Sequence, residues 1–83
     1  MEQIGFLMKP HGYHGLIKVI PLAGKKDKFV DLSKVYLSDG NGNSSWFNVD
    51  EIRPYTRGRF ILKVNGFTKR EEVEKFFRFS IAV

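Results

Sequence analysis

The chain has 83 residues, of which 42% are apolar and 14% aromatic, and it contains no cysteine. A chain of this length has room for one hydrophobic core, and its apolar content is too high for an intrinsically disordered segment. The absence of cysteine excludes disulfide scaffolds, thiol nucleophiles and iron–sulfur clusters, and it predicts a reducing compartment.

Lys and Arg outnumber Asp and Glu by 14 to 9, which gives a formal net charge of +5. This excess favours polyanionic neighbours such as RNA through long-range attraction. No apolar run approaches the roughly 20 residues that a membrane-spanning helix needs, and the start of the chain lacks a secretion signal. We therefore expect a cytoplasmic protein that has no contact with a membrane.

Short runs of alternating apolar and polar residues recur along the chain, separated by Gly, Asn, Asp and Pro. This pattern is typical of an all-β barrel or sandwich. We expect six strands, at Gln3–Lys9, Leu16–Leu22, Lys34–Ser38, Ser45–Arg53, Arg59–Asn65 and Phe79–Val83.

The connection between the first two strands contains two glycines, Gly12 and Gly15, after Pro10. Glycine adopts left-handed backbone conformations without steric cost, so this spacing predicts a tight reversal. We expect the ring of His11 to hydrogen-bond the backbone of this turn.

Three irregular segments are expected between the later strands. Ala23–Asp31 has no period and is predicted to be a loop, held to the barrel rim by Phe29 and Leu32. Asp39–Asn43 is rich in residues that tolerate positive φ and predicts a hairpin turn. A change of phase near Asp50-Glu51 predicts a bulge or bend, which a closing barrel requires.

One short helix is expected before the last strand. Thr68 and Glu71 fit a capping box, in which the hydroxyl and the carboxylate each accept a hydrogen bond from a free backbone N–H. Val73, Phe76 and Phe77 follow at helical spacing. The helix is predicted to cover one end of the barrel.

Catalytic and metal-binding constellations are weak in this sequence. His11 and His14 are three residues apart, but a metal site needs at least three ligands and no cysteine or paired carboxylate lies near them. No Gly-rich phosphate loop opens a helix, and no Ser lies in a nucleophile elbow. We therefore expect no catalytic residues, no metal, no cofactor and no small-molecule substrate.

Basic residues occur in groups that favour contact with RNA phosphates. Two of these groups lie in the long loops, and a third, Lys69 and Arg70, lies at the start of the helix. The loop residues predicted to contact RNA are Lys25, Lys26, Lys28, Arg53, Arg57 and Arg59. The aromatic residues Tyr13, Tyr36, Trp46 and Tyr55 are open to either of two roles, stacking on unpaired bases or packing at the barrel rim.

The first third of the chain resembles the amino-terminal domain of the RimM family of ribosome maturation factors. The residues that carry the resemblance are Ile4-Gly5, Lys9-Pro10-His11-Gly12, and Gly15 followed by Leu16-Ile17-Lys18-Val19. The similarity continues in register through the strand Phe60-Ile61-Leu62-Lys63 and the helix that begins near Thr68. It therefore covers nearly the whole chain.

This resemblance implies a closed six-stranded Greek-key barrel, akin to the second domain of translation elongation factors. Residues 1–83 would form this domain, and a PRC-type barrel, absent here, would follow it in the full protein. Family members are non-catalytic assembly factors that bind the immature small (30S) subunit near its head, contacting its nineteenth protein and 16S rRNA. They aid late maturation and rRNA processing. The alternative is a general single-stranded nucleic-acid-binding barrel.

The motif turn and its flanks are the predicted partner surface, formed by Lys9, His11, Gly12, Tyr13, Gly15, Leu16 and Lys18. Two positions depart from the family pattern. Leu16 stands where the family usually has Glu, and with Ile20 it predicts a small apolar patch. Arg78 stands where a glycine usually ends the helix.

Overall fold

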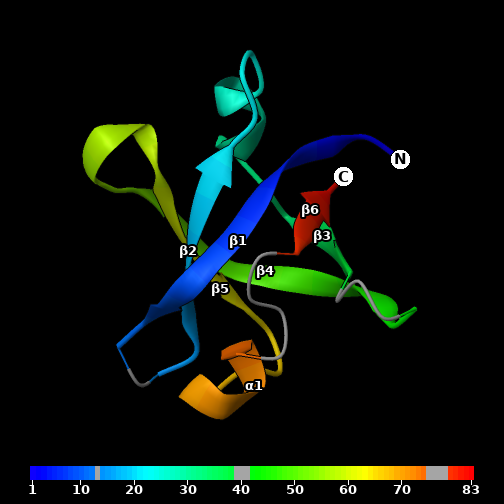
Figure 1. Cartoon of the computed structure of the whole chain (residues 1–83), viewed down its shortest axis with the longest axis vertical. Coiled ribbons are helices and arrows are strands. Elements are labelled where there is room, and N and C mark those ends of the chain that lie inside the picture. Colours follow the sequence, from blue (N-terminus) through cyan, green and yellow to red (C-terminus); the bar gives the residue numbers. More distant parts are fainter. Residues whose placement is uncertain (13, 39–41, 75–78) are drawn as a thin grey trace.

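The structure is a computed structural model that describes residues 1–12, 14–38, 42–74 and 79–83. In this part of the chain, six antiparallel strands close into a barrel in the order β1-β2-β5-β4-β3-β6 (Figure 1). The strands are β1 (Gln3–His11), β2 (Leu16–Pro21), β3 (Lys34–Ser38), β4 (Ser44–Pro54), β5 (Phe60–Val64) and β6 (Ser80–Ala82). The predicted fold class is confirmed, and the observed strand ends differ from those predicted by at most two residues.

The strands bury one face, as their period of two predicts. In β2, Ile17 and Val19 are fully buried, while Leu16, Lys18 and Ile20 lie on the outer face and are only partly covered. Each large apolar side chain removed from water stabilises the fold by about 1.5–3 kcal/mol before entropy is counted. Because the inner face of each strand is buried in the core, a partner can contact the strands only on their outer face.

The predicted loop at Ala23–Asp31 contains a short 3-10 turn, Lys26–Phe29, which lies at the top of the barrel in Figure 1. Phe29 is 1% exposed and stacks on Phe60, with ring centroids 5.1 Å apart. Leu32 packs against the same core. The anchoring of this segment by Phe29 and Leu32 is confirmed.

The barrel closes through bulges in two of its long strands. The pairing of β4 with β5 shifts register between Val49 and Glu51, which confirms the predicted bend. The pairing of β1 with β2 shifts between Leu7 and Pro10. Such bulges increase strand twist locally, so the six short strands can curve around one core.

The helix α1 (Arg70–Glu74) covers the end of the barrel opposite the 3-10 turn (Figure 1). It packs against β1 and β2 through Val73, which is 1% exposed. Several predicted features lie outside the described residues: Tyr13, most of the hairpin turn between Ser38 and Ser44, and the helix positions Phe76, Phe77 and Arg78. Among the described residues, no helix is long and apolar enough to cross a lipid bilayer.

The capping prediction was wrong about the acidic residue. The helix begins at Arg70, one residue later than a cap on Thr68 implies, so Glu72 rather than Glu71 occupies the third helical position. The Glu72 carboxylate accepts hydrogen bonds from the backbone N–H groups of Thr68 and Lys69, both at 3.1 Å. These bonds, the one from Thr68 first, hold the pKa of Glu72 below its ordinary value.

Replacing Glu72 by glutamine is expected to lower the urea midpoint of the chain at neutral pH, whereas Glu71→Gln should leave it nearly unchanged. Because the pKa of Glu72 is lower in the folded chain than in the unfolded chain, its carboxylate stabilises the fold above the unfolded pKa. That contribution is lost as pH falls through the folded pKa. The difference between wild type and Glu72→Gln should therefore shrink below a pH of about 4. An equal difference at pH 7 and pH 3 would contradict this role.

Candidate functional site

The motif turn is shaped by its two glycines in different ways. Both have left-handed backbones, with φ of +75° at Gly12 and +79° at Gly15. A Cβ at Gly15 would lie 2.4 Å from the carbonyl oxygen of Phe67, whereas one at Gly12 would meet nothing within 4 Å. The side chain of Lys63 donates a hydrogen bond to the same Phe67 carbonyl. The turn is therefore packed against the connection between β5 and α1.

The ring of His11 packs against Tyr55 instead of making the expected hydrogen bond to the turn. The two ring centroids are 5.2 Å apart with an interplanar angle of 69°. In the described part of the turn, which leaves out Tyr13, the His11 ring makes no hydrogen bond to the backbone. The aromatic edge contact was not predicted, because Tyr55 lies 44 positions further along the chain. His11 thus links the motif turn to the end of β4.

A row of side chains crosses the outer face of β2, β5 and β4. Lys18 pairs with Ile61, and Ile61 pairs with Arg53, so the three lie side by side in register. Ile61 is 1% exposed although it is not part of the inner core cluster. Its flanking neighbours therefore cover it from outside, as the aliphatic stems of Lys and Arg can do.

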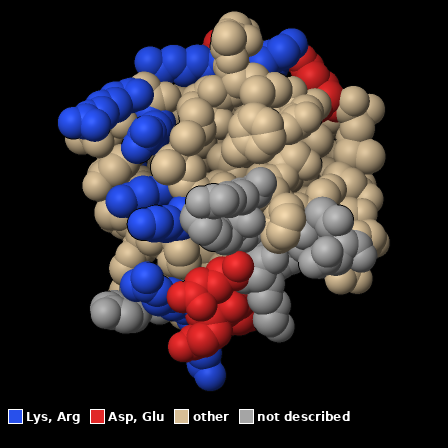
Figure 2. All heavy atoms as spheres, in the orientation of Figure 1, with Lys and Arg blue, Asp and Glu red and all other residues tan. Residues whose placement is uncertain are grey.

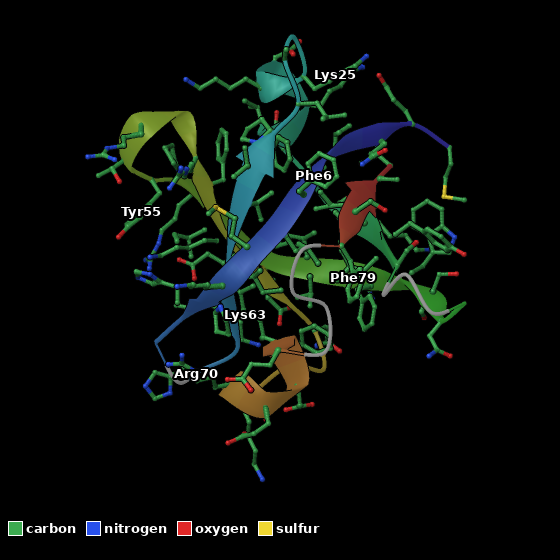
Figure 3. All side chains as sticks on the ribbon, viewed as in Figure 1. Phe6, Lys25, Tyr55, Lys63, Arg70 and Phe79 are labelled. Atoms are coloured by element: carbon green, nitrogen blue, oxygen red, sulfur yellow. The ribbon has the colours of Figure 1, made fainter. Side chains whose placement is uncertain are left out.

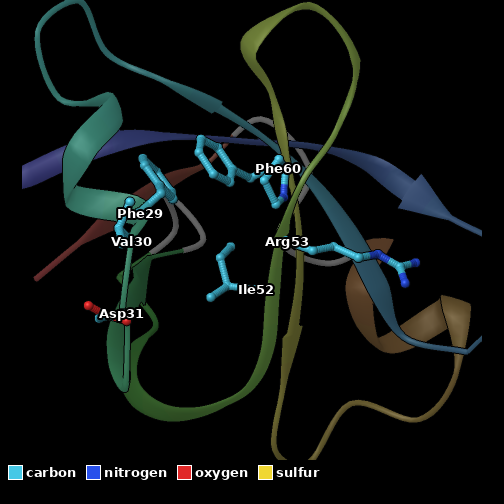
Figure 4. A pocket seen from close by; sticks show the side chains of 7 residues that line it. Phe29, Val30, Asp31, Ile52, Arg53 and Phe60 are labelled. Atoms are coloured by element: carbon cyan, nitrogen blue, oxygen red, sulfur yellow. The ribbon is translucent and has the colours of Figure 1, made fainter.

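Tyr55 lies beside this row, next to the Lys18 side chain. The Lys18 ammonium is 5.6 Å from the centre of the Tyr55 ring, within the range of a cation–π contact. Figure 3 shows Tyr55 at the outer edge of the barrel, away from the core. The residue is 38% exposed. Arg53 also borders an apolar hollow that is lined by Phe29 and Phe60. Figure 4 shows the Arg53 side chain pointing away from this hollow.

The turn after Tyr55 brings together basic residues from two of the predicted groups. Arg57 has a left-handed backbone (φ 60°, ψ 35°), and Gly58 follows with φ of +73°. The backbone N–H of Tyr55 donates to the carbonyl of Arg59 at 2.8 Å and closes the turn. The Lys26 ammonium nitrogen lies 3.2 Å from the position of a Cβ at Gly58. Lys26 therefore reaches the second basic group from the first.

Ion pairs divide the basic residues into two sets. Glu2 binds Lys25 and lies 3.8 Å from Lys28, and its hydrogen bond with Lys25 lowers the pKa of Glu2. Arg53 lies 3.4 Å from Glu51. Among the described residues, the basic side chains of the predicted site that have no carboxylate partner are Lys9, Lys18, Lys26, Arg57 and Arg59.

Figure 2 shows Lys and Arg side chains along the left edge of the molecule, over β2, β5 and the turn before β5, whereas Asp and Glu gather around α1 and at the upper right. We define the basic face as Lys18, Lys26, Arg53, Tyr55, Arg57 and Arg59. The sequence signal for this face is the local density of Arg around one Tyr, at Arg53, Tyr55, Arg57 and Arg59.

The remaining predicted positions lie around the motif turn. Leu16 is half-buried and pairs with His11 on one side and Lys63 on the other. Lys9 is exposed and borders a shallow pocket with Pro10, Arg70 and Glu74. In the described part of the chain, no three His, Asp or Glu side chains come together as a metal site would require.

The chain is similar to proteins of one family over almost its whole length. The family model described as the RimM N-terminal domain matches residues 3–83. The ribosome maturation factor RimM of Pseudothermotoga lettingae is 33% identical over 81 residues, which are 96% of this chain and 48% of that protein. RimM of Caldanaerobacter subterraneus subsp. tengcongensis is 28% identical over 72 residues, 87% of this chain and 43% of that protein.

The fold is also found in a solved structure. The crystal structure of the 16S ribosomal RNA processing protein RimM from Pseudomonas aeruginosa matches with a TM-score of 0.81 at 22% sequence identity, covering 98% of this chain and 48% of that chain. At this identity the match shows the shared barrel. The chain spans about half the length of the curated relatives it matches. Because the family model matches from residue 3 to the last residue, the chain belongs to the RimM family.

Proposed function

We propose that the protein is a non-catalytic assembly factor, which binds the immature small (30S) ribosomal subunit at its head and aids late maturation and 16S rRNA processing. Its partners would be 16S rRNA, the nineteenth protein of that subunit and a PRC-type barrel of its own, and it would act in the cytoplasm. The observation that carries this proposal is membership of the RimM family over residues 3–83. Two relatives of that family are named ribosome maturation factors.

The charge distribution of the domain supports contact with rRNA. Lys18, Lys26, Arg57 and Arg59 have no carboxylate partner among the described residues, so their charges are free to meet phosphates. Lys25 and Lys28 are also predicted rRNA contacts, but because they share their charge with Glu2 we expect each of them to add little to the affinity. The motif turn lies next to the basic face through the contact between His11 and Tyr55. A subunit could therefore contact both surfaces.

The test is the affinity of the whole natural protein for small subunits at two stages. Subunits purified from cells that lack the protein are expected to bind it at least tenfold more tightly than mature subunits, because an assembly factor must leave when assembly is complete. Equal binding to both kinds of subunit and to unrelated unstructured RNA would contradict the proposal. That result would favour the alternative of a general single-stranded nucleic-acid-binding barrel.

A further inference from the structure

Tyr55 is a partly exposed aromatic residue with the Lys18 ammonium over its ring, and the turn that follows it carries Arg57, Arg59 and the approaching Lys26, all without a carboxylate partner among the described residues. We propose that it forms a binding site for one unpaired nucleotide of RNA, in which the base stacks on the Tyr55 ring and Lys18, Lys26, Arg57 and Arg59 hold the flanking phosphates. This inference rests on the proposed function, since the RNA of the maturing subunit would supply the nucleotide.

The ring of Tyr55 is held in place before any ligand arrives. Its backbone N–H is bonded to Arg59, its side chain meets the edge of His11 at 5.2 Å, and the Lys18 ammonium lies 5.6 Å from its centre. Despite these contacts, 38% of the residue stays accessible. A ring that is already ordered loses little conformational entropy when a base stacks on it. The arrangement is therefore suited to a stacking platform.

The basic side chains beside Tyr55 and at the turn that follows it come from three separate segments. Lys18 extends from β2, Lys26 from the 3-10 turn, and Arg57 from the turn before β5. Lys26 and Arg57 are brought together because the Lys26 ammonium packs against Gly58. A strand of RNA has a phosphate on each side of every base, so one cation beside the Tyr55 ring and others at the turn that follows it match this charge pattern.

The backbone at Arg57 gives a second reason to assign a binding role to this turn. Arg57 has φ of 60°, a left-handed conformation that glycine adopts without strain and arginine does not. An arginine held there at a cost to the fold is a feature that marks binding sites more often than scaffolds. The Arg57→Gly change should relieve the strain and remove the charge, so weaker binding by this variant could not be attributed to unfolding.

The test measures binding of the whole natural protein to a short oligouridylate RNA and to the same strand with abasic residues, by fluorescence anisotropy. Wild type is expected to bind the base-bearing strand about tenfold more tightly than the abasic strand. Tyr55→Leu should lose this preference and Tyr55→Phe should keep it. Arg57→Gly should weaken binding of both strands alike and reduce the salt dependence.

Trp46 provides the matched control. It is 45% exposed, and it has its own lysine contact, with the Lys34 ammonium 5.5 Å from the ring, but it lies near the start of β4 rather than after its end. Trp46→Leu is expected to bind both strands like wild type. Equal loss in Trp46→Leu and Tyr55→Leu would show non-specific contact with surface aromatics and would overturn the proposal.

Parallel binding to maturing small subunits separates this inference from the proposed function. If wild type binds subunits but Tyr55→Leu keeps the full preference for bases, the stacking site is wrong and the proposed function stands. If wild type shows a Tyr55-dependent preference for bases but binds no subunits, the proposed function is wrong and the stacking site stands. Binding of neither RNA strand would overturn the site and indicate an acidic protein as the ligand of the basic face.

Discussion

Replacing Gly15 by alanine is expected to lower the free energy of unfolding of the chain by about 3 kcal/mol. Part of this cost, about 1 kcal/mol, comes from placing a side chain on a left-handed backbone with φ of +79°. The rest, about 1–3 kcal/mol, comes from forcing a methyl group into a space where the carbonyl oxygen of Phe67 would lie 2.4 Å away. A domain of this size has only about 4–12 kcal/mol of stability in total, so the loss would be severe.

The measurement for Gly15 is urea unfolding followed by circular dichroism, with Gly12→Ala as the matched control. Gly12 has φ of +75° but open space at its Cβ position, so only the backbone cost of about 1 kcal/mol should appear. The difference between the two variants isolates the contact with Phe67. Equal losses in both variants would show that the close packing of the turn has no energetic role.

Replacing Phe29 by alanine is expected to cost about 3–5 kcal/mol, because it removes a large side chain that is 1% exposed and leaves a cavity at one end of the barrel. It also removes the stacked contact with Phe60, whose ring lies nearly parallel at 16°. The variant should be largely unfolded near 37 °C, since each kcal/mol lost lowers the Tm by about 4–8 °C in a domain of this size.

Thermal unfolding of Phe29→Ala is best compared with Val30→Ala. Val30 is the next residue along the chain and is 63% exposed, so its truncation should change the stability by less than about 0.5 kcal/mol. A Tm for Phe29→Ala close to that of Val30→Ala would contradict the conclusion that Phe29 anchors this segment to the core.

The fold could be predicted from the sequence where a local period sets it. The strand Lys34–Ser38 was predicted with its observed ends, because Val35 and Leu37 alternate between polar neighbours and turn residues follow. The helix cap was misplaced by one residue, since two consecutive acids, Glu71 and Glu72, lie three and four residues after Thr68, and the choice between them depends on where the chain leaves β5. The point at which the chain leaves β5 is set by tertiary packing and not by the local sequence.

The candidate site could be predicted only in parts. The basic residues could be identified from the sequence, but which of them lie together could not. Lys26 and Gly58 belong to two turns that are distant in the chain and meet only in the folded barrel. Likewise, the expectation that His11 would bond its own turn overlooked Tyr55, which reaches it from the far end of β4. The sequence also does not show the ion pairs: Glu2 binds Lys25, whereas Lys26 has no carboxylate partner among the residues that the structure describes.

These results separate two roles within one small barrel. The glycine turn that identifies the family contributes shape, since Gly15 is required by its contact with Phe67. We propose that the binding chemistry lies on the neighbouring outer face of β2, β5 and β4, where the Lys18 ammonium lies over the Tyr55 ring and, in the part of the chain that the structure describes, has no carboxylate partner.

The most direct test of this assignment is the affinity of the whole natural protein for maturing small subunits when single charges are removed. Arg57→Gly is expected to weaken binding severalfold and to reduce the slope of log affinity against log salt by about 0.7, the value for one lost phosphate contact on single-stranded RNA. Lys25→Gln, which removes a charge already paired with Glu2, is expected to bind nearly as well as wild type. Unchanged binding by Arg57→Gly together with loss in Lys25→Gln would contradict the assignment and place the contact on the opposite side of the loop.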